Sequence, residues 1–155
     1  MTIGQCSGSA TVGPSPGPTV KCDFQTPTIC GFTNDPGADF SWTRLSGSTG
    51  SQGTGPTNDH TYGTAQGFYM YIETSSPRSQ GEKANLLSST FTASTTQKCL
   101  SFWYHMYGTN TGTLNAYVDQ NGARNQVWSK SGNQGNQWTA TSVNLAASAL
   151  SASYL

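Results

Sequence analysis

The chain has 155 residues, which is enough for one domain with its own hydrophobic core. Charged residues make up only 9% of it, and seven basic residues balance seven acidic ones, so no one-sided field is available for nucleic acid or an anionic membrane. Nucleic acid is therefore a poor candidate partner, and no run approaches the roughly 18 apolar residues that direct membrane insertion requires.

The N-terminal stretch is dominated by Gly, Ser, Thr and Pro, a composition that cannot bury enough apolar surface to order itself. We predict a flexible linker over residues 1–19 and a globular domain over residues 20–155. The cysteines match no zinc-binding spacing, so disulfide bonds in an oxidising compartment are the better interpretation. They are Cys6, Cys22, Cys30 and Cys99.

Further along the chain, apolar and polar residues alternate with a period of two, which is typical of β-strands. The pattern covers residues 68–74, 99–107, 113–119, 126–129 and 137–145. No window of eleven or more residues holds a helical stripe, and turn-forming residues separate the strands. The sequence therefore predicts an all-β fold, an antiparallel sandwich of two sheets.

The stretch "KCLSFWYHMYG" (98–108) is the densest aromatic segment and fixes the predicted faces of its strand. Leu100, Phe102, Tyr104 and Met106 alternate with Trp103, His105 and Tyr107, so we place the first set in the core and the second on the outer face. A histidine there is more often a partly covered sheet residue than a catalyst. The predicted core comprises Phe24, Trp42, Ile72, Leu87, Leu100, Phe102, Tyr104, Leu114 and Val118.

The long glycine-rich loop at 46–64 holds the only sequence neighbours that could suggest catalysis, Asp59 and His60. Adjacent residues rarely form the Asp–His hydrogen bond of a triad, and no nucleophile or phosphate-binding motif occurs. We therefore predict no catalytic residue and no enzyme activity. Asp59 and His60 remain candidates, with Trp103, His105 and Tyr107, for a face that binds a ligand or partner.

Two acidic residues beside Gly and Pro, Asp35 and Asp39 in "NDPGADF", could supply oxygen ligands to a calcium or sodium ion. Asp-Pro-Gly is also ordinary turn chemistry, in which Asp39 bonds a nearby amide, and we favour this interpretation. No cofactor is required by any motif.

Several segments, taken in order, resemble the MAM domain, an extracellular module of meprin-type proteases, neuropilins and adhesive receptor tyrosine phosphatases. The segments include "CDFQTPTICGFTND" (22–35), "DFSWTR" (39–44), "YMYIETSSPRSQGEKANLLSSTF" (69–91), "CLSFWYHMYG" (99–108) and "VWSKSGNQGNQW" (127–138). The resemblance implies a jelly-roll-like β-sandwich, an extracellular location and no catalytic activity. Gln25 stands where the family usually has Glu, which weakens a cation site of the family's kind.

The resemblance also implies how the cysteines pair. The family bonds the residues that match Cys22 and Cys30, and the short loop containing Pro27 suits that bond. Family members continue through further strands to a last cysteine that bonds the match of Cys99. We therefore expect a domain that lacks its last strands. Because no strand is expected to fix Cys6 near Cys99, we also expect a free, largely buried Cys99 thiol and a Cys6 that is mobile and reactive or paired with another chain.

Functionally, the resemblance implies a non-enzymatic adhesion or protein-interaction module of a larger secreted or membrane-anchored protein. Its partner would be an extracellular protein, bound homophilically or heterophilically. One alternative is a carbohydrate-binding module, because a solvent-open Trp103 ring could stack on a pyranose. Another is an accessory domain of a secreted metalloprotease.

Overall fold

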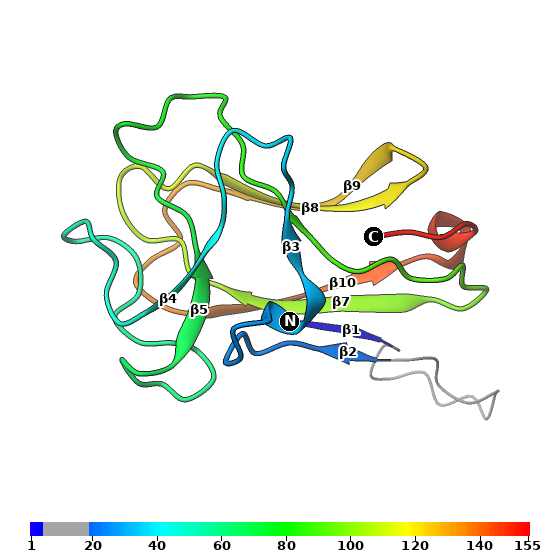
Figure 1. The fold of residues 1–155 in the computed structure, drawn as a ribbon, viewed down its shortest axis with the longest axis horizontal. Helices are drawn as coiled ribbons and strands as arrows, with labels where there is room; N and C mark the ends of the chain where they lie inside the picture. Colours follow the sequence, from blue (N-terminus) through cyan, green and yellow to red (C-terminus); the bar gives the residue numbers. More distant parts are fainter. Residues whose placement is uncertain (5–18) are drawn as a thin grey trace.

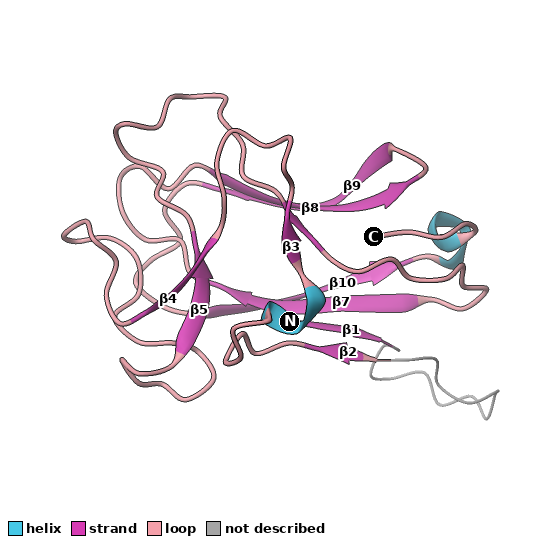
Figure 2. Ribbon diagram, in the orientation of Figure 1, coloured by secondary structure: helices cyan, strands magenta, loops and turns pink. Residues whose placement is uncertain are grey.

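The computed structural model describes residues 1–4 and 19–155, which fold into an all-β jelly-roll sandwich (Figures 1 and 2). Every described strand pair is antiparallel, and the described part contains no α-helix. The strands are β1 (Thr2–Gly4), β2 (Val20–Lys21), β3 (Thr33–Asn34), β4 (Thr43–Ser46), β5 (Phe68–Tyr71), β6 (Leu86–Leu87), β7 (Lys98–Tyr104), β8 (Thr113–Gln120), β9 (Ala123–Ser131) and β10 (Thr139–Leu145). Short 3-10 helices lie at Ile29–Gly31 and Ala147–Leu150.

One layer is a four-stranded sheet in the order β10-β7-β1-β2, drawn across the lower half of Figure 1. The β8–β9 hairpin faces it across the core, β4–β5 stands at one end, and β3, which pairs with β6, runs across the long strands in the view of Figure 1. Trp128 on β9 packs against the rings of Phe102 and Tyr104 on β7, with centroids 5.0 and 5.2 Å apart. The inner face of β7 is thus sealed by aromatic contacts with the opposite layer.

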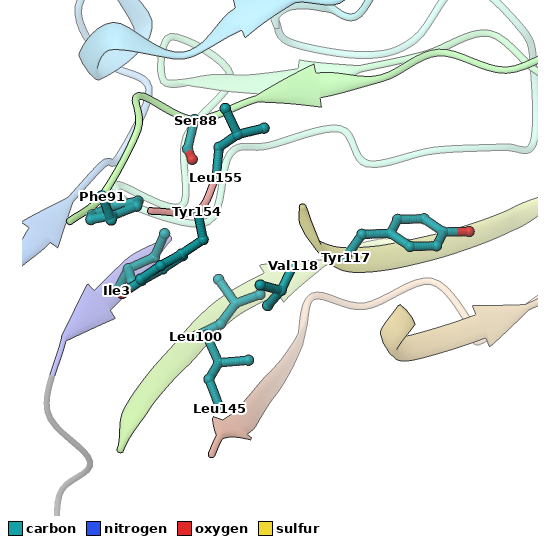
Figure 3. A pocket seen from close by; sticks show the side chains of 9 residues that line it. All are labelled: Ile3, Ser88, Phe91, Leu100, Tyr117, Val118, Leu145, Tyr154 and Leu155. Carbon is teal, nitrogen blue, oxygen red and sulfur yellow. The ribbon is translucent and has the colours of Figure 1, made fainter. Parts of the chain in front are cut away.

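The predicted faces of the central strand are confirmed. Leu100, Tyr104 and Met106 are buried, whereas Trp103 is 47% exposed. Figure 3 shows Leu100 of β7 and Val118 of β8 lining a small apolar cavity of about 40 Å³ between the layers. The alternation of side chains along an extended strand accounts for this agreement.

Other core predictions are met unevenly. Leu100, Tyr104 and Val118 are buried as predicted. The remaining predicted core residues are only half-buried: Phe24, Trp42, Ile72, Leu87, Phe102 and Leu114. Fully or nearly fully buried positions that the sequence analysis missed are Phe32, Tyr69, Leu145, Leu150 and Tyr154.

Strand β5 shows why period alone misleads. Its most buried residue is Tyr69, on the face opposite Ile72, because the Tyr69 ring packs edge-on against Trp138 and its hydroxyl donates to Gly47 O at 2.7 Å. The other face is covered by the Arg44 guanidinium, which lies 3.3 Å from the centroid of the Phe68 ring. Both faces of β5 are therefore protected, and neither behaves as a simple solvent face.

The N-terminal linker prediction is wrong for residues 2–4. These residues form β1, which inserts between β2 and β7 and pairs Ile3 with Leu100. The terminal ammonium of Met1 donates to Cys22 O at 2.6 Å, which anchors this strand at its start. The remainder of the predicted linker, residues 5–18, lies outside the described residues.

Two cysteine predictions have different outcomes. Cys22 and Cys30 are disulfide-bonded, with their Cα atoms 5.7 Å apart, as expected. Cys99 is also disulfide-bonded, so the prediction of a free thiol there is wrong. That prediction assumed that no strand fixes the N-terminal residues near Cys99, but β1 pairs Gly4 directly with Cys99. The prediction for Cys6 falls on a residue outside those described.

Candidate functional site

The outer face of β7 carries an exposed aromatic surface. The His60 ring stacks on the Trp103 ring, with centroids 3.9 Å apart and planes 23° from parallel. Tyr62, in the same loop as His60, is 63% exposed and is the most exposed large hydrophobic residue described. We call His60, Tyr62 and Trp103 the aromatic surface.

Trp138 lies at the base of this surface and ties the loop to the sheet. Its indole ring meets His60, His105 and Tyr69 edge-on, at centroid distances of 6.2, 5.5 and 5.7 Å. Its Nε1 donates to Asn58 O at 3.0 Å. The loop residue His60 is thereby held over Trp103 rather than left free in solvent.

His105 directly follows Tyr104, the last residue of β7, and is half-buried beside Trp138. Its Nε2 lies 3.1 Å from Asn136 Oδ1, and its buried Nδ1 has no partner among the described residues. Burial lowers the pKa of His105, and the contact with Asn136 opposes this shift only partly. Burial also lowers the pKa of His60, against the pull of the nearby Asp59 carboxylate. Both rings therefore favour the neutral form at pH 7.

Asp59 is not on the exposed face, because its side chain is only 1% exposed. One carboxylate oxygen accepts from Thr64 N at 3.1 Å, and the other accepts from Tyr62 N at 2.9 Å and Gln25 Nε2 at 3.2 Å. A Cβ placed on Gly67 would lie 2.0 Å from the carboxylate carbon. Asp59 therefore folds the loop that presents Tyr62 and His60, and none of its hydrogen-bond partners among the described residues is a histidine.

The amide of Gln25 completes this buried network. Its Nε2 also donates to Phe68 O at 3.0 Å, and its Oε1 accepts from Phe68 N at 3.0 Å. An uncharged amide can both donate to Asp59 and pair with the edge of β5, whereas a carboxylate could not donate. Gln25 at this position thus suits the buried Asp59 charge.

The two candidate metal ligands have different roles, because Asp35 closes its own turn and Asp39 bonds a segment 44 residues away. Asp35 accepts from Gly37 N at 2.9 Å, from Asn85 Nδ2 at 3.0 Å and from the Arg124 guanidinium at 3.3 Å. These hydrogen bonds, with that from Asn85 largest, lower the pKa of Asp35. Asp39 accepts from Lys83 N at 2.7 Å. No cluster of three or more metal-binding side chains occurs among the described residues.

A second polar cluster surrounds Glu73, just beyond β5. One of its carboxylate oxygens accepts from the Tyr71 and Ser51 hydroxyls at 2.5 and 3.0 Å, and the other accepts from Ser75 N and Oγ at 3.0 and 2.7 Å. These bonds, with that from Tyr71 largest, lower the pKa of Glu73 from 4.5 to about 2. Glu73 thus fixes the loop around Ser51 to the end of β5.

Replacing Glu73 with glutamine should flatten the acid dependence of stability. Because the folded-state pKa is lower than the ordinary value, ionised Glu73 stabilises the fold fully above pH 4.5, and this contribution disappears as pH falls towards 2. Urea unfolding at several pH values in this range should show that, as pH falls, the free energy of unfolding decreases more steeply for the wild type than for Glu73→Gln. Glu82→Gln, which alters only an exposed ion pair with Arg78, is the control and should follow the wild type. Parallel curves for wild type and Glu73→Gln would contradict this assignment.

The structure therefore divides the five residues predicted for a ligand or partner face. It brings His60 and Trp103 together, places His105 beside Trp138, buries Asp59, and puts Tyr107 at the edge of a separate polar cleft. Sequence reasoning missed Tyr62 and Trp138. An isolated aromatic in a glycine-rich loop is the signal that could have identified Tyr62.

These features define the class of protein: a disulfide-bonded jelly-roll β-sandwich whose loops and outer sheet face carry the exposed aromatic residues. Residues 22–154 match the family model described as "MAM domain, meprin/A5/mu", and the chain belongs to this family. Within the described residues, no helix has the length and apolar character needed to cross a membrane.

Named relatives agree with this assignment. The chain is similar to human MAM domain-containing glycosylphosphatidylinositol anchor protein 2, with 43% identity over 139 residues, covering 80% of this chain and 14% of the relative. It is also similar to chicken MAM domain-containing glycosylphosphatidylinositol anchor protein 1, with 43% identity over 136 residues, covering 83% and 14%. Thyroid hormone-induced protein B of Xenopus laevis is 39% identical over 141 residues, covering 89% and 20%. The chain thus spans a fifth or less of the length of these relatives.

Proposed function

We propose that this MAM domain is an extracellular, non-enzymatic adhesion module that binds a protein partner through the aromatic surface. Two findings support the extracellular assignment: the disulfide bonds, and the glycosylphosphatidylinositol anchor in the names of relatives. The relatives' names also favour a membrane-anchored parent protein over a secreted metalloprotease.

The observation that carries the proposal is the exposure of Tyr62 and Trp103, at 63% and 47%. Tryptophan and tyrosine are the residues that most often dominate binding energy at protein interfaces, and charge is depleted at the centres of such interfaces. The loop bearing Tyr62 is fixed by Asp59, so the surface is formed before a partner arrives and loses little entropy on binding.

A sugar-stacking role for Trp103 is less well supported. A pyranose stacks on one open ring face, and His60 already covers one of the two faces of Trp103, so at most one face is left for a sugar. The edge and remaining surface of the indole suit insertion into a protein pocket. This observation favours a protein partner over a carbohydrate at Trp103.

Catalysis has no support from the described geometry. Neither His60 nor His105 is hydrogen-bonded to a carboxylate, serine or cysteine in the described part of the chain. We therefore propose that the domain has no hydrolase activity of its own. A turnover that disappears in His60→Ala or His105→Ala would contradict this view.

Adhesion can be tested with beads coated with the purified chain, because multivalent display makes weak contacts measurable. Aggregation of coated beads would indicate homophilic binding, and attachment to cells that lack the chain would indicate heterophilic binding. For the heterophilic case, trypsin treatment of the cells should abolish attachment. Beads that neither aggregate nor attach, or that attach equally after trypsin treatment, would contradict a protein partner.

A further inference from the structure

A polar cleft of about 440 Å³ opens at the end of the sandwich where several loops meet. Its walls come from the loop after β4, the segment after β5, the turn after β7 and the connection between β9 and β10. Residues that matter to its chemistry are Ser51, Gln52, Glu73, Tyr107, Asn110 and Asn133. It is far larger than the apolar cavity of Figure 3, and its volume falls in the range of small-molecule sites.

The walls of this cleft are held in place by the protein itself. Thr54 Oγ1 and Gly55 N both donate to Tyr107 O, at 2.7 and 3.0 Å, which ties the first loop to the turn after β7. A Cβ at Gly108 would lie 2.6 Å from Thr54 Oγ1, so this close approach requires glycine. Thr74 Oγ1 donates to Asn110 O and fixes the far side of the turn. The cleft is therefore preorganised rather than a gap between mobile loops.

Charge restricts what the cleft can bind. Among the residues that the structure describes, its lining contains no Lys, Arg or His, so no side chain there neutralises a phosphate, sulfate or carboxylate. The lining has one carboxylate, Glu73, whose two oxygens already accept four hydrogen bonds. A hard cation is usually bound with the help of carboxylates, and the one carboxylate described in this lining is already occupied. The fitting ligand is neutral.

Hydrogen-bonding capacity defines the ligand further. Among the described residues, no partner is present for the side chains of Gln52 and Asn110 or for the hydroxyl of Tyr107. Asn133 uses its Oδ1 to accept from Gly135 N, which leaves its amide N–H groups available. The amides supply both donors and acceptors, and the half-buried Tyr107 ring supplies an apolar surface. Such a combination matches a molecule that has many hydroxyls and an apolar ring face.

We propose that this cleft binds a neutral pyranose, either free or as a unit of a glycan on a neighbouring molecule. Tyr107 would contact the apolar ring face, while Gln52, Asn110 and Asn133 bond the hydroxyls. This proposal is independent of the aromatic surface, which lies on Trp103, His60 and Tyr62. A protein partner and a sugar could therefore be bound by different residues of the same domain.

Saturation-transfer NMR and titration can test it with methyl α-mannopyranoside, methyl β-galactopyranoside and N-acetylglucosamine, with sialic acid as the charged comparison. At least one neutral probe should bind saturably and more tightly than sialic acid. Tyr107→Ala and Asn133→Ala should each weaken that binding about fivefold or more, and Tyr107→Phe should weaken it less than Tyr107→Ala. Trp103→Ala and Tyr117→Ala, both exposed aromatics outside the cleft, should leave it unchanged.

Absence of saturable binding by all three neutral probes would overturn the proposal. So would binding that is unchanged in both Tyr107→Ala and Asn133→Ala, or stronger binding of sialic acid. An unfolding midpoint equal to that of the wild type shows that a variant is folded and that its loss of sugar binding is local to the cleft. If Tyr107→Ala fails to fold, Asn133→Ala alone tests the proposal. Comparing a glycopeptide with its released glycan then distinguishes the two sources, since tighter binding of the glycopeptide indicates a glycan on a neighbouring protein.

Discussion

Replacing Asp59 with alanine is expected to lower the free energy of unfolding by about 3 kcal/mol. The carboxylate is buried and accepts hydrogen bonds from Gln25, Tyr62 and Thr64, and alanine would leave these donors without their charged acceptor. Urea unfolding at pH 7 measures the loss. Asp59→Asn keeps the shape of the side chain but places an amide group, with its own N–H donors, against the N–H donors of the loop. It should therefore lower the free energy of unfolding by about half as much as Asp59→Ala.

Asp39→Ala is the matched control for Asp59. Asp39 is exposed, and among the described residues its carboxylate accepts a single hydrogen bond, from Lys83 N at 2.7 Å, so Asp39→Ala should lower the free energy of unfolding by about 1 kcal/mol or less. Equal effects of the Asp59 and Asp39 substitutions would refute the claim that Asp59 organises the 59–67 loop.

Arg44→Ala should also reduce stability by about 3 kcal/mol. Its Nε donates to Phe24 O at 2.7 Å, and a terminal nitrogen donates to Gln25 O at 2.6 Å. The guanidinium also covers the Phe68 ring at 3.3 Å, so it joins the disulfide-closed N-terminal loop to β5. Lysine cannot reproduce this planar arrangement, and Arg44→Lys should restore less than half of the loss.

Arg78→Ala is the control for Arg44→Ala, because Arg78 also covers an aromatic ring but lacks the two hydrogen bonds to backbone carbonyls that Arg44 makes. Arg78 lies over the Phe40 ring at 4.5 Å and pairs with Glu82, but it is more exposed and bonds no backbone carbonyl in the described residues. Its replacement should cost less than about 1 kcal/mol. If thermal or urea unfolding gave Arg44→Ala and Arg78→Ala similar losses, the proposed role of Arg44 would be wrong.

The strands were predictable where a strand has one buried face. Alternation placed Leu100, Tyr104 and Val118 correctly, because each lies between two layers of the sandwich. It failed for Tyr69, where a tryptophan from the distant β9–β10 connection buries the face that was expected to be outer. Pattern within a strand carries no information about what a remote loop will cover.

The other incorrect predictions concern strands too short to show a pattern and contacts between residues far apart in the sequence. β1 contains only Thr2–Gly4, too few residues to show a period, and its pairing with β7 could not be inferred from composition. The disulfide bonding of Cys99 was missed for the same reason. In the candidate site, Asp59 and His60 looked equivalent in sequence, yet one is buried by Gln25 and the other stacks on Trp103.

The most direct test of the account is a comparison of partner binding by Trp103→Ala, Tyr107→Ala and Tyr117→Ala. All three remove an aromatic side chain, but only Trp103 belongs to the aromatic surface, and Figure 3 shows the Tyr117 ring pointing away from the core on β8. Each folded variant is titrated onto cells that carry the trypsin-sensitive partner or, if binding is homophilic, is tested in bead aggregation. Of the three substitutions, only Trp103→Ala should weaken binding, by at least tenfold. Unchanged binding by Trp103→Ala, or an equal loss in all three variants, would contradict recognition through this surface.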